Sequence, residues 1–187
     1  KDNSINNYDS ENENLISDEK IINGEHLTFY DNGNVKSKVN YKNEKIDGEQ
    51  FEYYNSGRLF KKRYYSNGLL DTTKSTYEYF ESGQLLSEYR EVIKGSSVYM
   101  DGNFISYYEN GIKMFEGEYA LNKKIGIWSK YYNSGELFYQ LNYDSLYSDN
   151  IFYIESYYKN GQLLLQTNII DGDPDRFHGN YISYFKS

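Results

Sequence analysis

The sequence predicts an all-β protein, an elongated repeat array of antiparallel β-hairpins that forms one twisted meander sheet. A turn sequence of two aromatic residues, any residue, Asn or Ser, and Gly recurs six times. The turn glycines follow one another at steps of 24, 26, 28, 24 and 26 residues. Between the turns, apolar and polar residues alternate as they do in strands. A period of this size is typical of repeat arrays.

The turn sequences themselves predict the turn geometry. They are Phe29–Gly33, Tyr53–Gly57, Tyr79–Gly83, Tyr107–Gly111, Tyr131–Gly135 and Tyr157–Gly161, and a seventh begins at Tyr184 and Phe185. The residue before the glycine is Asn in three copies and Ser in three. Ser tolerates positive φ poorly, so a two-residue type I′ turn is disfavoured. We predict a type I turn followed by a glycine bulge, with positive φ only at the glycine.

Each repeat is predicted to be one hairpin plus a linking turn. In the first copy, residues 24–30 form the outgoing strand, residues 35–42 return, and residues 43–47 lead to the next copy. A second glycine precedes the turn glycine by nine positions in four copies, at Gly24, Gly48, Gly102 and Gly126, whereas Lys74 and Phe152 stand there in the other two. Linkers 91–101 and 144–150 are less regular, and we predict longer polar loops there.

Period-two alternation assigns side chains to the two faces. Leu27 and Phe29 fall on one face, and His26 and Tyr30 on the other. The returning strands begin with an aliphatic residue that we expect to fill the gap between aromatic rows, namely Val35, Leu59, Leu85, Leu137 and Leu163, with Lys113 as the exception.

Composition divides the chain into two parts. Residues 1–19 are rich in Asn, Asp, Glu and Ser, and are predicted to form a flexible acidic N-terminal tether. Residues 20–187 are predicted to form the repeat domain of about six and a half repeats. The mean hydropathy is −0.87, and the chain holds 24 Tyr against one Trp and two Met. Burial must therefore come largely from tyrosine rings, which suits a thin structure.

The charge limits the classes of partner. A net charge of −8 and a pI near 4.9 argue against nucleic acid and disfavour an anionic membrane surface. The basic cluster of Arg58, Lys61, Lys62 and Arg63 is a local exception, which we interpret as a solvated strand face. No apolar run approaches the roughly 20 residues of a membrane span, so no integral membrane segment is predicted.

Residues suited to catalysis or metal binding are scarce. The chain has no Cys, and His26 and His178 stand at opposite ends, which argues against zinc and against a nucleophile triad. The run Asp171 to Asp175 is similar to the start of a calcium loop, but Arg176 and Ile182 occupy the positions that need Gly and Glu. We predict no enzyme activity, no catalytic or metal-binding residues and no cofactor.

The aromatic residues remain as the candidate binding surface. It consists of Tyr30, Tyr54, Phe80, Tyr108, Trp128, Tyr132 and Tyr158. Two interpretations stay open: these rings only stabilise a one-layer sheet, or some of them contact a partner. Trp128 is the best single candidate for a contact because Trp and Tyr are favoured anchors at protein interfaces.

The fourth copy resembles a known repeat. Tyr107–Gly111 is followed by Ile112, Gly117, Tyr119, Asn122 and Gly126, a pattern similar to the MORN repeat. The paired aromatic residues are closer to the bacterial variant, including YwqK-like proteins described as antitoxins. The resemblance covers about residues 24–187 and implies stacked hairpins that act as interaction scaffolds. The second glycine of the motif, Gly117, is replaced elsewhere by Val39, Arg63, Tyr89, Leu141 and Thr167.

We therefore predict a non-enzymatic scaffold that mediates protein–protein interaction. The alternatives are an antitoxin-type binder of a cognate toxin, which would be cytoplasmic, and a structural or carbohydrate-contacting surface protein. A start at Lys1 followed by a tether predicts a removed upstream segment, and hence an exported, lipoprotein, cell-surface or periplasmic location. The last hairpin is incomplete at Ser187, which predicts edge-strand self-association.

Overall fold

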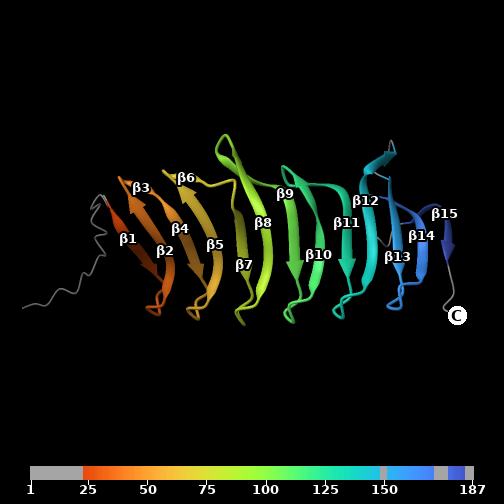
Figure 1. Cartoon of the computed structure of the whole chain (residues 1–187), viewed down its shortest axis with the longest axis horizontal. Helices are drawn as coiled ribbons and strands as arrows, with labels where there is room; N and C mark the ends of the chain where they lie inside the picture. The colour runs from red at the N-terminus through yellow and green to blue at the C-terminus, as the bar shows by residue number, and fades with distance from the viewer. Residues whose placement is uncertain (1–22, 148–150, 171–176, 184–187) are drawn as a thin grey trace, which may run out of the picture.

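The computed structural model describes residues 23–147, 151–170 and 177–183. These residues form fifteen strands in one antiparallel sheet, so the all-β hairpin array is confirmed. The sheet is long, open and one layer thick (Figure 1). The glycine turns lie along one side of it and the linkers along the other.

Six hairpins follow one another in chain order. They are β1 (Gly24–Phe29) with β2 (Val35–Lys42), β4 (Gly48–Tyr53) with β5 (Leu59–Ser66), β7 (Ser75–Tyr79) with β8 (Leu85–Lys94), β9 (Ser97–Tyr107) with β10 (Lys113–Ala120), β11 (Lys123–Tyr131) with β12 (Leu137–Tyr147), and β13 (Ile151–Tyr157) with β14 (Leu163–Ile170). The strand β15 (Phe177–Ser183) pairs with β14. Two short strands, β3 (Lys45–Ile46) and β6 (Leu69–Leu70), pair with the ends of β2 and β5.

The predicted turn geometry is confirmed. In the first hairpin the Gly33 N–H donates to the Tyr30 carbonyl at 2.9 Å, and the Tyr30 N–H donates to the Asn34 carbonyl at 2.8 Å. The six turn glycines have φ between 82° and 104°, and the residue before each is not in the left-handed region. The register shifts just before every turn, as a glycine bulge requires.

The predicted cross-strand neighbours at the turns are also confirmed. The first aromatic residue of each turn stands opposite the first residue of the returning strand. The pairs are Phe29 with Val35, Tyr53 with Leu59, Tyr79 with Leu85, Tyr107 with Lys113, Tyr131 with Leu137, and Tyr157 with Leu163.

The prediction of a polar loop at residues 91–101 is wrong. These residues continue β8 and β9, which meet in a two-residue turn at Gly95 and Ser96. The apolar residues Val92, Ile93 and Val98 lie in these strand extensions. Cross-strand pairing there satisfies the backbone hydrogen-bonding groups. In the second predicted loop, residues 144–147 belong to β12, and residues 148–150 lie outside the described residues. The tether 1–19 and the acidic run 171–175 also lie outside them.

The buried apolar residues gather in one row of cross-strand neighbours. Val39, Tyr89, Trp128, Leu141 and Ile154 are each at most 7% exposed. All five belong to a row that follows the register across the sheet through His26, Val39, Gln50, Arg63, Thr76, Tyr89, Phe104, Gly117, Trp128, Leu141, Ile154 and Thr167. We call this the central row, and the face that carries it the row face. In this one-layer sheet the buried apolar side chains therefore form a single row across the strands.

Candidate functional site

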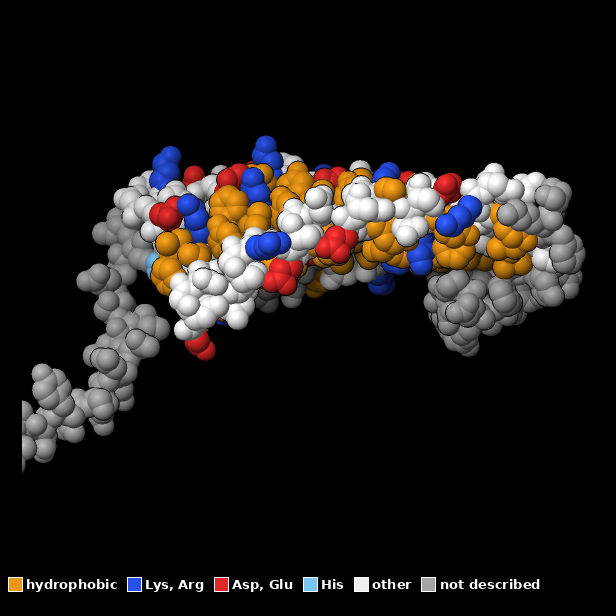
Figure 2. All heavy atoms as spheres, turned by 90° about the horizontal axis from the view of Figure 1, so that it is seen from below, with side chains coloured by type: hydrophobic (Ala, Val, Ile, Leu, Met, Phe, Trp, Pro, Cys, Tyr) orange, Lys and Arg blue, Asp and Glu red, His pale blue; other side chains and the backbone are white. Residues whose placement is uncertain are grey.

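The second aromatic residue of each turn links neighbouring hairpins. The hydroxyls of Tyr30, Tyr54, Tyr108 and Tyr132 donate to the backbone carbonyls of Tyr53, Tyr79, Tyr131 and Tyr157, at 2.6, 2.7, 2.8 and 3.0 Å. Each of these four rings is half-buried. Phe80 occupies the same position without a hydroxyl, and Tyr158 is half-buried as well. Hydrophobic side chains accordingly gather along the turn side of the molecule (Figure 2).

These contacts assign a structural role to the predicted tyrosines. Each hydroxyl reaches the first aromatic residue of the next repeat, so it fixes the spacing between hairpins. Amide side chains also link neighbouring hairpins, since Asn32 and Asn110 donate hydrogen bonds to the backbone carbonyls of Asn55 and Asn133 at 3.0 and 2.9 Å.

Trp128 lies inside the row face and does not offer its ring at the surface. It is 3% exposed, so the side chain proposed as the best single candidate for a contact is part of the buried core. Its ring packs against Phe104 at 5.6 Å and Tyr119 at 4.9 Å between centroids, and its Nε1–H donates to the Glu118 carbonyl at 3.1 Å. Gly117 makes this possible, because a Cβ atom there would overlap three atoms of the indole.

This contact explains a departure from the repeat pattern. Gly117 is a glycine for steric reasons, because its backbone is outside the left-handed region. In the other copies the equivalent position carries a side chain, as at Val39 and Leu141. Gly117 and Trp128 are both evident in the sequence, but nothing in the sequence shows that they are in contact. Their register across β10 and β11 was the missing information.

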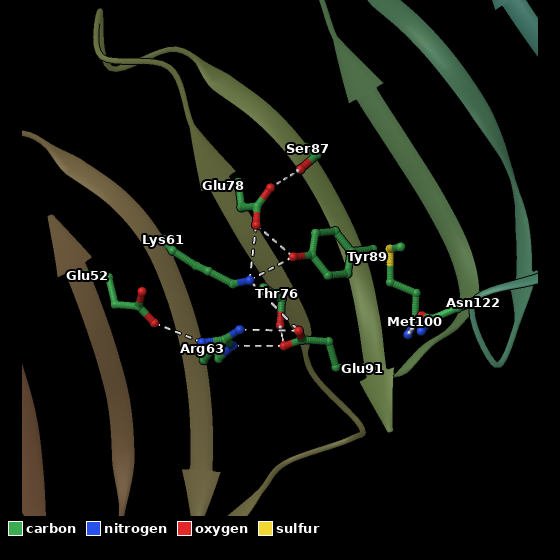
Figure 3. Close-up of polar contacts among 10 residues, drawn as sticks. All are labelled: Glu52, Lys61, Arg63, Thr76, Glu78, Ser87, Tyr89, Glu91, Met100 and Asn122. Carbon is green, nitrogen blue, oxygen red and sulfur yellow. Dashed lines mark hydrogen bonds and ion pairs between the residues drawn. The ribbon is translucent and has the colours of Figure 1, made fainter. Parts of the chain in front are cut away.

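A buried ion-pair network crosses β4, β5, β7 and β8 on the row face (Figure 3). Glu91 is one centre of this network, and it is 7% exposed. Its carboxylate accepts hydrogen bonds from Arg63 Nε at 2.9 Å and from Thr76 Oγ1 at 2.8 Å, and Lys61 Nζ lies 3.8 Å away. Arg63 also donates from its other side to Glu52 Oε1 at 2.8 Å.

Glu78 forms the second centre of the network. Its carboxylate accepts hydrogen bonds from Tyr89 OH at 2.8 Å and Ser87 Oγ at 3.2 Å, and forms an ion pair with Lys61 Nζ at 3.0 Å. Lys61 therefore bridges both glutamates, as Figure 3 shows. The network is continuous with the central row, because Arg63, Thr76 and Tyr89 belong to both.

The interpretation of the basic cluster as a solvated strand face is wrong for three of its members. Lys61 is 9% exposed, and only 22% of the Arg63 side chain and 21% of the Lys62 side chain are exposed. Their charges are tolerated there because buried cations can be compensated by paired carboxylates. Lys62 pairs with Glu49 at 2.6 Å, and Arg58 is exposed.

Burial and hydrogen bonding act in opposite directions on the two glutamates. Burial by itself would raise the pKa of Glu91, but the hydrogen bonds from Arg63 and Thr76 and the charges of Arg63 and Lys61 lower it below its ordinary value. The pKa of Glu78 is lowered in the same way, against burial, by Tyr89, Lys61 and Ser87. Burial and the neighbouring Glu78 raise the pKa of Tyr89. Both carboxylates are therefore held as anions.

Next to the network, the row face is hollowed into an apolar groove between β7 and β11. Its volume is about 570 Å³. The apolar lining comes from Leu86, Met100, Phe104, Met114, Phe115, Tyr119 and Trp128, and the polar lining from Glu78, Ser87, Tyr89, Ser106 and Lys124. The groove arises where small side chains, Ser87 and Ser106, stand among large ones.

The repeated hairpins and the single sheet define the class of protein. It is an open, single-layer β-hairpin repeat protein whose polar and apolar side chains meet on one face. The sequence matches the MORN repeat variant over residues 22–43, 46–68, 100–120 and 124–145, and the chain belongs to this family of repeat proteins. MORN repeats generally serve in interactions with proteins or membranes. No curated protein matches the chain.

The structure extends the repeat beyond the matched segments. The β7–β8 and β13–β14 hairpins lie outside these segments, yet they have the same turn and register as the others. They are the two copies in which Lys74 and Phe152 replace the leading glycine.

Neither a membrane helix nor a metal cluster is found where the chain is described. Among those residues, no helix has the length and apolar character that crossing a membrane requires. Over the same ranges, no group of three or more His, Cys, Asp or Glu side chains is arranged to hold a metal ion. His26 instead meets Tyr41 edge to face at 6.3 Å.

Proposed function

We propose that this protein is a non-enzymatic scaffold that binds a protein partner on the row face, over the groove between β7 and β11. The observation that carries the proposal is the groove itself, an apolar hollow of about 570 Å³ on an open sheet. Protein interfaces bury roughly 800 Å² on each partner and centre on apolar and aromatic side chains. A long one-layer sheet offers an area of that kind.

The chemistry of the network supports a role without catalysis. A general acid or base needs a pKa near the working pH and access to a substrate proton. The pKa values of Glu78 and Glu91 are lowered, and their carboxylates are already engaged by Lys61, Arg63, Thr76 and Tyr89. Such an arrangement stabilises the sheet and fixes the side chains at the border of the groove.

A site-specific cross-linking experiment tests the proposal. A photoreactive benzoylphenylalanine is placed at Met114, which lines the groove, and in a second variant at Ile127, which lies on the opposite face and is 57% exposed. Both variants are irradiated in the producing cell. We expect a defined protein adduct from position 114 that is absent from position 127.

Two outcomes would contradict the proposal. Equal protein adducts from both positions would mean that the row face is not selective. Glycan adducts alone would favour the carbohydrate-contacting alternative. If a protein is captured at position 114, its sequence distinguishes a cognate toxin from a surface ligand.

A further inference from the structure

The groove contains a buried hydroxyl with no hydrogen-bond partner. Ser106 is 5% exposed and lines the groove, and its Oγ makes no hydrogen bond in the described part of the protein. A buried polar atom left unpaired costs about 1–3 kcal/mol. A ligand that lies in the groove and presents a backbone N–H or carbonyl would satisfy this hydroxyl.

Two lysines border the groove on the β11 side and lie over aromatic rings. The Lys124 ammonium is 4.4 Å from the Trp128 ring centroid, and the Lys130 ammonium is 5.3 Å from that of Phe115. Neither ammonium forms an ion pair with a carboxylate among the described residues. Desolvation against the rings lowers the pKa of Lys124, although the residue keeps an exposed side.

Two other cations next to the groove are neutralised. Lys61 and Arg63 each contact two glutamates in the network beside the groove. In a chain of net charge −8, Lys124 and Lys130 are thus the cations beside the groove that contact ring faces and form no ion pair among the described residues. A cation over a ring retains the capacity to bind a carboxylate.

The apolar surface continues beyond the groove along the β8–β9 hairpin. Met100 lines the groove and stands opposite Glu91, and two residues farther along, Ile93 stands opposite Val98. Period-two alternation places both on the row face. Ile93 is 43% and Val98 50% exposed, so the apolar strip extends onto the projecting hairpin.

We propose that the groove binds an extended peptide segment of a protein partner, in which large apolar side chains seated between β7 and β11 are flanked by acidic residues that pair with Lys124 and Lys130. The inference rests on the proposed function and names the chemistry of the partner. The Ser106 hydroxyl bonds the peptide backbone, and the Ile93–Val98 pair extends the apolar contact. The acidic residues of the peptide give specificity, because the net negative charge of the protein disfavours binding of an acidic peptide away from these two lysines.

An extended segment fits this surface better than a small amphiphile does. Sites for small ligands enclose about 70–90% of the ligand surface. The groove is open along one face of a single layer, and its apolar lining runs on to the exposed Ile93 and Val98. A peptide covers such a strip along its length, and its side chains enter the groove in turn.

Binding of three synthetic peptides tests the proposal. The parent is a fluorescently labelled Glu-Gly-Phe-Leu-Gly-Glu; one control replaces both Glu by Gln, and the other replaces Phe-Leu by Ser-Ser. We expect the parent to bind with a Kd below about 1 mM and each control to bind at least about tenfold more weakly. Fluorescence polarisation at 50 and 200 mM salt measures both the affinity and its charge dependence.

Protein variants locate the site. Lys124→Gln combined with Lys130→Gln is expected to weaken the parent peptide about tenfold and to leave the Gln control unchanged. Lys123→Gln is the matched control, since Lys123 neighbours Lys124 on β11 and is exposed. Circular dichroism verifies that each variant is folded.

Several results would overturn the inference. They are equal binding of the parent and the Gln control, an unchanged parent affinity in the double lysine variant, or no saturable binding of the parent. Lysine-dependent binding of vesicles of phosphatidylserine and phosphatidylcholine, without peptide binding, would replace the peptide by a membrane. If cross-linking from Met114 still captures a protein, the scaffold role survives while the acidic peptide is rejected.

Discussion

From β4 to β8 the central row passes through Arg63, Thr76 and Tyr89, whereas from β11 to β13 it passes through Trp128, Leu141 and Ile154. The first part buries charged side chains that are paired across strands, and the second buries apolar ones that pack directly. Both parts share the same backbone repeat and the same turns. The comparison shows that the turns and strand pairing are common to the whole array, while the row residues differ from one copy to the next.

The two parts are expected to differ in their response to substitution. Packing in the apolar part depends on shape, so deleting a ring leaves a hollow. The ionic part depends on pairing, so removing one charged side chain leaves the charges of its partners buried and uncompensated. In a repeat array each unit contacts only its neighbours, and damage is expected to remain local.

The largest effect is expected from Trp128→Ala. The indole is 3% exposed and contacts Phe104, Tyr119 and Tyr143, so its loss is expected to cost about 3–5 kcal/mol. Native-state hydrogen exchange should show lost protection in β10 to β12 and near-normal protection in β1 to β5. Uniform loss over all strands would contradict the local character of the apolar part.

Glu91→Ala tests the ionic part. Its removal leaves Arg63 without its bidentate partner and Lys61 and Thr76 with one contact fewer, and we expect a loss of about 2–4 kcal/mol. Urea unfolding followed by tyrosine fluorescence measures it. Glu109→Ala is the matched control, since Glu109 is exposed in a turn. A loss below about 0.5 kcal/mol, the usual size of a surface change, would show that the network contributes little.

Gly117→Ala tests the steric link between the motif glycine and Trp128. The added methyl overlaps the indole, and overpacking of this kind costs about 1–3 kcal/mol. In the background of Trp128→Leu, Gly117→Ala is expected to reduce the free energy of unfolding by a smaller amount, because the leucine side chain leaves room for the added methyl group. Equal costs in both backgrounds would mean that Gly117 is needed for another reason.

Acid is expected to weaken the ionic part selectively. Because the pKa values of Glu78 and Glu91 are lower when folded, their contribution is fully present above the ordinary value of 4.5 and is lost as the pH falls through the lowered values. Hydrogen exchange compared at pH 6 and pH 3.5 should show β5, β7 and β8 losing more protection than β11 and β12. The opposite order would contradict the assignment of the network.

The smallest effects are expected at the tyrosines that link the turns. Tyr54→Phe removes one half-buried hydrogen bond to the Tyr79 carbonyl and is expected to cost about 1 kcal/mol. The reverse change, Phe80→Tyr, supplies the missing hydroxyl and is expected to stabilise by about 0.5–1 kcal/mol. Thermal unfolding measures both, and a destabilised Phe80→Tyr variant would refute a shared geometry at this turn.

Turn chemistry was predictable because it is local. The aromatic pair followed by Asn or Ser and Gly fixes a type I turn with a glycine bulge, and the spacing fixes the hairpin. The β8–β9 hairpin was mispredicted for a related reason, since Gly95 and the serines around it suggested a polar loop. The strand pairing that extends through Ile93 and Val98 depends on residues far apart in the chain.

The sequence by itself determined the repeat, the order of the strands and the six glycine turns, because each depends on residues within one unit. Only the tertiary structure decided which side chains meet across strands, since that depends on register between units. It buried Trp128 on Gly117, gathered Lys61, Arg63, Glu78 and Glu91 into one network, and left Lys124 and Lys130 over aromatic rings beside the groove.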